Sequence, residues 1–201
     1  ARKLKSRNSD IILWNEVQPH MMEDMKTEGV FPNYIIGNRG RSSDNPMQCA
    51  ISFRNGIEIL NIEEPLPFGK RCLVVTTQFE DERTVVFVAV HLKAGESQKS
   101  EEVRIKEMER ILDHLGSMPP ADAFVIAGDF NSDPKLTSYY NSQLHDYLQT
   151  RNFTNLTGFH TTYNGWAPCQ FDYVYGLGLR KTGEPIVDSM PLRAPNDTQG
   201  S

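Results

Sequence analysis

Several apolar, strand-length runs of this chain end on an acidic or imidazole side chain. Glu16, His91 and Asp129 each follow such a run, and Asp172 lies at the end of another. A carboxylate next to a buried strand is costly unless it binds something. Ligand sites in open α/β sheets gather at strand ends. We therefore expect these four side chains to converge on one site, although up to 156 residues separate them in the sequence (172 − 16).

The chemistry of this set favours a hard divalent cation. Carboxylates together with the Asn131 amide offer oxygen ligands, which Mg²⁺ and Mn²⁺ prefer. Such a cation neutralises phosphate charge and polarises a phosphoryl oxygen. The set thus indicates chemistry on a phosphate ester.

Each residue alone also has an ordinary structural interpretation. Glu16 fits a solvated strand-end charge, His91 a hydrogen-bonded strand histidine, and Asp172 a loop cap. Asp129 with Asn131 fits an Asx turn before a helix. Only the combination favours a functional site.

Two hairpins are predicted from turn signals. Asn55-Gly56 separates two alternating segments, Cys49 to Arg54 and Ile57 to Ile62, and predicts a hairpin between them. Leu73 to Phe79 and Thr84 to His91 form a second predicted hairpin around a charged turn. Later strands are predicted at the segments Ala123 to Ala127, Phe171 to Tyr175 and Pro185 to Ser189.

Three helices are predicted between these strands. The first runs from about Pro19 to Glu28 and ends at Gly29. The clearest runs from Glu101 to Leu115, with Ser100 as its N-cap and Gly116 at its end. A third opens at Asp133-Pro134 and reaches about Leu148. Strand hairpins interleaved with helices predict a layered α/β or α+β domain.

Composition excludes several classes of protein. The 201 residues carry a net charge of −5 with 38% hydrophobic residues, which argues against disorder and against a generally basic nucleic-acid coat. The apolar runs are far too short to span a bilayer, so no membrane partner is expected. Three widely spaced cysteines favour a reducing compartment, the cytoplasm or nucleus, while three Asn-X-Thr sequons leave secretion open.

Four motifs in order resemble the endonuclease/exonuclease/phosphatase superfamily, which includes pancreatic deoxyribonuclease and deadenylases. The most diagnostic is Ile126-Ala-Gly-Asp-Phe-Asn-Ser-Asp-Pro. The other three motifs are a segment that ends in Glu16, a segment that runs through His91-Leu-Lys-Ala, and a segment that contains Gln170-Phe-Asp-Tyr. The resemblance implies a four-layer α/β sandwich of the deoxyribonuclease-I type, with two mixed β-sheets flanked by helices.

The resemblance also implies roles for the matched residues. Glu16 would ligate Mg²⁺ or Mn²⁺, and Asp129 would orient or deprotonate the attacking water. Asn131 would position the scissile phosphate or the nucleophile, and His91 would donate to a phosphoryl oxygen. Asp172 would fix the tautomer of a histidine partner.

Two further positions are expected to contact substrate. Lys93 would add a positive charge at the phosphate, although a solvated loop lysine is an equal interpretation. Asn15 stands where the superfamily usually has Gln before the metal-binding Glu. It is taken as a substrate-binding residue with a side chain one methylene shorter.

Within the superfamily, His91-Leu-Lys-Ala, the arginine-bearing helix after it and Thr161-Thr-Tyr resemble the nocturnin, Angel and carbon-catabolite-repressor deadenylase branch. This branch implies a Mg²⁺-dependent 3′-to-5′ exoribonuclease acting on single-stranded RNA. Gly95 stands where nocturnin-type proteins tend to have Arg, which weakens a nicotinamide-dinucleotide phosphatase interpretation.

Alternatives to the deadenylase interpretation stay open. The same motifs suit a phosphatase or phospholipase on a small phosphorylated metabolite or lipid, or a DNA repair endonuclease, because they bind the phosphate and not the leaving group. The superfamily's first-strand Asn and closing Ser-Asp-His would lie before residue 1 and after Ser201. We therefore expect residues 1–201 to be the interior of one such domain. An inactive scaffold of the same fold is the remaining alternative.

Overall fold

The computed structural model describes residues 9–37, 48–64, 71–134, 143–157, 162–163 and 168–179. The predicted strand at 185–189 lies outside them. Within the described ranges, no helix has the length and apolar character needed to cross a membrane.

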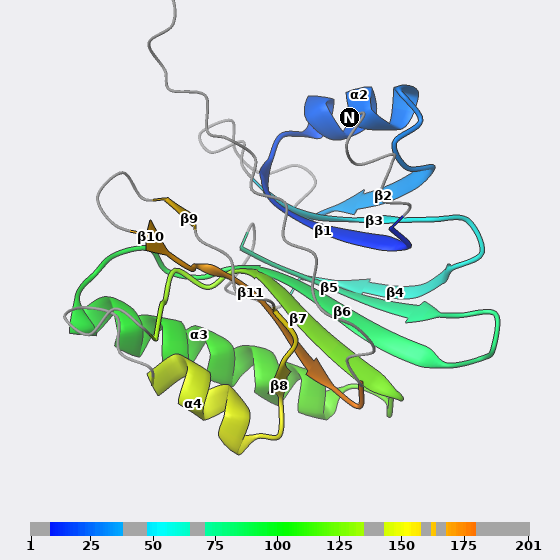
Figure 1. The fold of residues 1–201 in the computed structure, drawn as a ribbon. Coiled ribbons are helices and arrows are strands. Elements are labelled where there is room, and N and C mark those ends of the chain that lie inside the picture. The colour runs from blue at the N-terminus through cyan, green and yellow to red at the C-terminus, as the bar shows by residue number, and fades with distance from the viewer. Residues whose placement is uncertain are drawn as a thin grey trace, which may run out of the picture.

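Two β-sheets pack face to face between helices (Figure 1). The larger sheet has the strand order β4-β5-β6-β7-β11-β8. The bounds of these strands are Glu58–Glu63, Cys72–Gln78, Thr84–His91, Ala123–Asp129, Asp172–Leu177 and Thr154–Asn155. Its β6–β7 pair is parallel and its other pairs are antiparallel, so the sheet is mixed.

The smaller sheet has three strands in the order β1-β3-β2. They span Ile11–Val17, Gln48–Phe53 and Asn33–Ile36. Helix α2, Pro19–Thr27, covers its outer face, while α3, Gln98–Ser117, and α4, Gln143–Thr150, cover the outer face of the larger sheet (Figure 1). A short pair, β9 at Thr162–Tyr163 and β10 at Pro168–Cys169, is separate. The four-layer α/β sandwich is confirmed.

Three apolar clusters separate the four layers. Between the sheets lie Ile51, Phe53, Val75 and other buried side chains. A smaller cluster around Met22 joins α2 to the small sheet. Each cluster needs an apolar face on both sides, which explains the continuous apolar runs of the central strands: β6 is buried at every position except its two ends.

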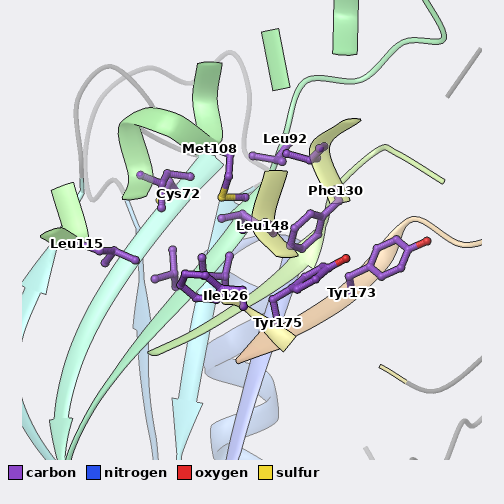
Figure 2. Packing of buried hydrophobic residues seen from close by; sticks show 14 of the residues in the cluster. Cys72, Leu92, Met108, Leu115, Ile126, Phe130, Leu148, Tyr173 and Tyr175 are labelled. Carbon is purple, nitrogen blue, oxygen red and sulfur yellow. The ribbon is translucent and has the colours of Figure 1, made fainter. Parts of the chain in front are cut away.

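The third cluster joins α3 and α4 to the large sheet. Figure 2 shows Met108 and Leu115 of α3 and Leu148 of α4 packed with Ile126 and Tyr175 of the sheet. This apolar contact fixes α3 beside the chain segments that follow β6 and β7.

The hairpin predicted around Asn55-Gly56 is wrong. The turn exists, with Gly56 at a φ of 90°, but β3 and β4 belong to different sheets. β3 pairs with β1 and β2, and β4 pairs with β5. The local turn signal sets where the chain reverses, while the apolar faces of distant strands decide the pairing. The second predicted hairpin, β5–β6, is confirmed by seven aligned residue pairs.

Helix α3 begins earlier and ends later than predicted. Ser97, not Ser100, is its N-cap, and the Ser97 hydroxyl accepts from the Ser100 backbone N–H at 3.1 Å. The helix continues through Gly116 to Ser117, since glycine in a helix costs only about 1 kcal/mol.

The other two helices agree with prediction in part. Helix α2 stops at Thr27, and Gly29 follows with a φ of 66°. Asp133 and Pro134 are not helical, and the predicted third helix is seen as α4 from Gln143. Positions 135–142 lie outside the described residues. Cys49 and Cys72 are buried free thiols.

Candidate active site

A break in the register of β1 places Glu16. The β1–β3 pairing shifts between Trp14 and Val17, and Glu16 adopts a φ of 54°, which is rare for a residue with a side chain. Bulges re-aim a side chain next to functional sites. The Glu16 side chain is 56% exposed.

Three strands of the larger sheet bring His91, Asp129 and Asp172 into one row. His91 aligns with Asp129 across the parallel β6–β7 pair, and Asp172 aligns with Asp129 across the antiparallel β7–β11 pair. Residues that align on adjacent strands point to the same face. The row lies where β6 and β7 end and β11 begins.

Glu16 joins this row from the other sheet. The His91 Nε2 atom lies 3.7 Å from Asp129 Oδ2 and 4.0 Å from Glu16 Oε1. The His91 and Asp129 side chains are 24% and 25% exposed. A half-buried imidazole thus lies between two carboxylates that separate sheets supply.

The turn after β7 holds Asn131 in the same region. The Asp129 Oδ1 atom accepts from the Asn131 backbone N–H at 2.8 Å. The Asn131 Nδ2 atom donates to the Leu92 carbonyl at 3.1 Å. Asn131 has a φ of 49°, a conformation that Asn tolerates better than most residues. The turn therefore links the ends of β6 and β7.

Asn15 has backbone partners in both neighbouring strands. Its amide nitrogen donates to the Val90 carbonyl at 3.1 Å, and its amide oxygen accepts from the Asp129 backbone N–H at 2.6 Å. A side chain at Gly128 would collide with the Val90 carbonyl and press on this amide. Asn15 thus fastens the end of β1 to the large sheet, and its substrate-binding role stays a prediction.

Lys93 is exposed just beyond the row. Its backbone N–H donates to the Glu107 Oε2 atom, and its carbonyl accepts from Arg104 Nη1, both at 2.8 Å. Its main chain is therefore fixed by α3, while its side chain extends into solvent.

The carboxylates of the row repel one another. Burial is the main cause that raises the pKa of Asp129, and the Glu16 charge adds to it, while the Asn131 N–H and His91 oppose it. Burial, with the charges of Asp129 and Glu16, raises the pKa of Asp172 to about 6. The row therefore carries more negative charge than His91 can balance.

This charge excess fits a hard divalent cation. The available donors are carboxylate oxygens, which suit Mg²⁺ or Mn²⁺. The Glu16 side chain, 56% exposed, is more accessible than the Asp129 side chain, 25% exposed. In the part of the chain that the structure describes, no three His, Cys, Asp or Glu side chains form a closed metal-binding group. The residues present therefore fit an open site, with Glu16 as a protein ligand.

A sequence profile of endonuclease/exonuclease/phosphatase family 2 matches residues 52–161, more than half of the chain. The chain belongs to this family. It is therefore a hydrolase of a family of phosphodiesterases and nucleases, as the sequence predicted. No curated protein sequence matches the chain significantly.

Solved structures share the fold at low sequence identity. The human nocturnin catalytic domain with bound sulfate is 17% identical, with a TM-score of 0.64 over 87% of this chain and 71% of that chain. ANGEL2, a 2′,3′-cyclic phosphatase, is 15% identical, with a TM-score of 0.63 over 87% and 71%. D. rerio TDP2 complexed with a single-stranded DNA product is 17% identical, with a TM-score of 0.65 over 92% and 76%.

Sequence reasoning missed the polar residues behind the site. Glu101 and Arg104 are almost completely buried in α3, and Asp133 is buried in the loop after Asn131. The Asp133 Oδ2 atom accepts from the Gln170 backbone N–H at 2.8 Å, which ties this loop to the start of β11. The available signal was the position of Arg104, which lies four residues before the buried Met108 and so on the inward face of α3.

Proposed function

We propose that this chain is a Mg²⁺- or Mn²⁺-dependent phosphodiester hydrolase that shortens single-stranded RNA from its 3′ end, as deadenylases do. The observation that supports this most is the meeting of Glu16, His91 and Asp129 at one strand-end edge, from both sheets of a phosphodiesterase fold. We also propose that the whole chain belongs to this one domain.

In this proposal, Glu16 holds the cation. A bound divalent cation supplies positive charge that offsets the phosphate and polarises its oxygen. Glu16 is suited to this because it is exposed and adjacent to His91 at 4.0 Å. The charge excess of Asp129 and Asp172 favours cation binding for the same reason that their pKa values are raised.

Asp129 and Asn131 act on the attacking water. Asp129 is half buried and its raised pKa brings it nearer to the range of an effective general base. Its Oδ1 atom is held by the Asn131 N–H, which fixes the carboxylate plane. The Asn131 side-chain oxygen is then available to orient the water or the scissile phosphate.

His91 and Lys93 act on the phosphate. His91 donates a hydrogen bond to a phosphoryl oxygen on which charge develops. Lys93, two residues further along the same segment, adds a positive charge. Asp172 orients a histidine partner, and in the described residues no histidine is bonded to its carboxylate.

Two observations support a single-stranded nucleic acid as the substrate, and the first of them favours RNA. The segment His91-Leu-Lys-Ala and the arginine-bearing α3 resemble the deadenylase branch. The shared folds include nocturnin, ANGEL2 and a TDP2 bound to single-stranded DNA. The substrate panel below separates RNA from DNA.

The test is an exonuclease assay on a 5′-fluorescein oligoadenylate of 20 nucleotides. We expect a ladder of shortened products in Mg²⁺ or Mn²⁺ and none in EDTA. Glu16→Gln should abolish the ladder, while Glu28→Gln, which removes an exposed carboxylate at the end of α2, should leave it unchanged. Absence of shortening with either cation would refute the proposal.

A 2′,3′-cyclic phosphate mononucleotide and a single-stranded DNA of equal length complete the panel. ANGEL2 motivates the first, since it shares the fold and is a 2′,3′-cyclic phosphatase. Turnover of the cyclic phosphate without RNA shortening would favour the phosphatase alternative. Preference for DNA would favour the repair nuclease, and no turnover of any member would favour a scaffold.

A further inference from the structure

Helix α3 carries three polar side chains on its inward-facing side. Glu101, Arg104 and Glu107 follow one another at intervals of three, so they lie along one side of the helix. Glu101 is 1% and Arg104 0% exposed, and the Glu107 side chain is 12% exposed. We call these residues the α3 polar strip. Charged side chains are almost never buried unless they are paired.

The α3 polar strip holds the main chain of Lys93 at both its N–H and its carbonyl. The Glu107 Oε2 atom accepts from the Lys93 backbone N–H at 2.8 Å. Arg104 Nη1 donates to the Lys93 carbonyl at 2.8 Å and to the Gly95 carbonyl at 2.9 Å. Such charge-assisted bonds are about twice as strong as neutral ones. We call these hydrogen bonds from Glu107 and Arg104 the Lys93 clamp.

Glu101 holds Arg104, one of the two side chains of the Lys93 clamp, in position. Arg104 Nε donates to Glu101 Oε2 at 2.6 Å. The other Glu101 oxygen accepts from the Ser132 hydroxyl at 3.3 Å and from the Leu144 backbone N–H at 3.1 Å. The clamp is thus connected to the loop after β7 and to the start of α4.

The segment before Lys93 is anchored separately. The Leu92 N–H donates to the Asp129 carbonyl at 2.9 Å, and the Leu92 carbonyl accepts from Asn131 Nδ2 at 3.1 Å. Leu92 is 1% exposed. Loosening the clamp should therefore move Lys93 and leave His91 in place.

We propose that Arg104 and Glu107 are positioning residues that set the direction of the Lys93 ammonium group toward the substrate phosphate. The inference rests on the proposed function, in which Lys93 binds that phosphate. An exposed lysine has many rotamers, and fixing the backbone from both sides reduces the volume that its ammonium group samples. The clamp acts on substrate affinity and not on the chemical step.

Glu107→Met is the variant that tests the clamp. It removes the acceptor of the Lys93 N–H, and that amide can turn to water because Lys93 is exposed. Arg71→Met is the matched control, since it removes the other partner of Glu107, 3.1 Å away, and leaves the bond to Lys93. Glu107→Gln keeps an oxygen acceptor without the charge, so it should keep part of the protection of the Lys93 amide.

The first measurement is amide hydrogen exchange by NMR on the full chain, which needs no substrate. We expect the Lys93 amide to exchange at least about tenfold faster in Glu107→Met, which corresponds to losing a charge-assisted hydrogen bond. Arg71→Met should stay near wild type, Glu107→Gln should lie between wild type and Glu107→Met, and the Leu92 amide should be unchanged throughout. An unchanged Lys93 amide in Glu107→Met would overturn the clamp.

The second measurement is a double-mutant cycle on KM and kcat for the best substrate of the panel. Lys93→Ala should raise KM about tenfold and Glu107→Met about threefold, both with kcat near wild type, as expected for lost uniform binding. In the Lys93→Ala background, Glu107→Met should add nothing.

The outcomes separate the two proposals. Additive effects on KM would overturn the clamp's action through Lys93, as would a fall in kcat alone. A Lys93→Ala variant with unchanged KM would refute the role of Lys93 in the proposed function, while the exchange result would still decide whether the clamp exists.

Discussion

The carboxylates at the strand ends and those of helix α3 differ in their partners: among the described residues, only the second group has guanidinium partners. Glu101 bonds to Arg104, and Glu107 bonds to Arg71. In the part of the chain that the structure describes, the cationic partner of Asp129 is the half-buried His91 imidazole at 3.7 Å, and no cation is paired with the Asp172 carboxylate. Burial and mutual repulsion raise the pKa of both.

The difference separates structural from functional acids. Paired and hydrogen-bonded carboxylates satisfy their charge within the fold, and removing a partner leaves a buried charge uncompensated. Carboxylates without guanidinium partners repel one another until a ligand supplies positive charge. Neutralising an acid should therefore stabilise the strand-end group, whereas removing a partner should destabilise the α3 polar strip.

Arg104→Met should have the largest effect on stability. It leaves Glu101 buried without its cation, which costs about 3–5 kcal/mol in the free energy of unfolding. Urea denaturation at pH 7 measures it. Arg54→Met is the control, because its ion pair with Asp10 is about half exposed and is worth about 1 kcal/mol at most. Equal effects of the two variants would contradict the comparison.

Asp129→Asn should separate activity from stability. The substitution is nearly isosteric, so packing changes little. Without the carboxylate, the rate should fall by at least about 10²-fold, the lower scale of acid–base contributions. The thermal midpoint in EDTA should stay unchanged or rise, because repulsion with Glu16 is relieved.

Turnover and the thermal midpoint, each measured on wild type and on Asp129→Asn, test this prediction. Near-normal turnover would show that Asp129 only closes the turn with Asn131. A clearly lowered thermal midpoint in EDTA would show that its charge stabilises the fold, and the two groups of acids would then not differ in kind.

The sequence revealed the strand-end group more readily than the α3 polar strip. Glu16, His91 and Asp129 interrupt apolar runs of strand length, and this local contrast is visible without any tertiary contact. Their convergence was predicted from the rule that ligand sites gather at strand ends, while the order of β6, β7 and β11 that aligns them came from the structure. Their catalytic roles stay predictions.

Local signals failed wherever a distant partner decided the outcome. The Asn55-Gly56 turn was predicted, but its flanking strands pair with β1, β2 and β5 and not with each other. Arg104 has the spacing of an inward-facing residue, yet a charged side chain at a helix position ordinarily indicates solvent. Its partners, the carbonyls of Lys93 and Gly95, lie up to 11 residues away and cannot be read from helical periodicity.

Asp172→Asn should stabilise the protein above pH 6 in EDTA. The pKa of Asp172 is raised from 3.8 to about 6 in the folded state, so the folded protein prefers the protonated acid. The associated stability is present below about pH 4 and is lost as pH rises through about 6. Two pKa units correspond to roughly 2–3 kcal/mol.

Urea denaturation of wild type and Asp172→Asn at pH 4 and pH 7.5 checks this sign. The two proteins should be nearly equal at pH 4, and the variant should be more stable at pH 7.5. A variant that is less stable at pH 7.5 would show that the Asp172 charge is compensated in the folded protein.

His145 provides the smallest test, on a buried group whose two ring nitrogens have neutral hydrogen-bond partners. Its Nε2 atom donates to the Ser132 carbonyl at 3.2 Å, and its Nδ1 atom accepts from the Tyr175 hydroxyl at 2.7 Å. Burial lowers the pKa of His145, so the folded state prefers the neutral ring. Stability linked to this group is therefore present above pH 6.5 and is lost as pH falls below it, the opposite sign to Asp172.

His145→Gln should lose this pH dependence, so its stability relative to wild type should improve as pH falls from 7.5 to 5.5, as measured by urea denaturation. Tyr175→Phe keeps the imidazole and should keep the dependence. If the unfolding free energies of His145→Gln and wild type change equally with pH over this interval, the folded protein tolerates a protonated His145 ring. Burial alone would then not decide the charge of groups packed beside α3.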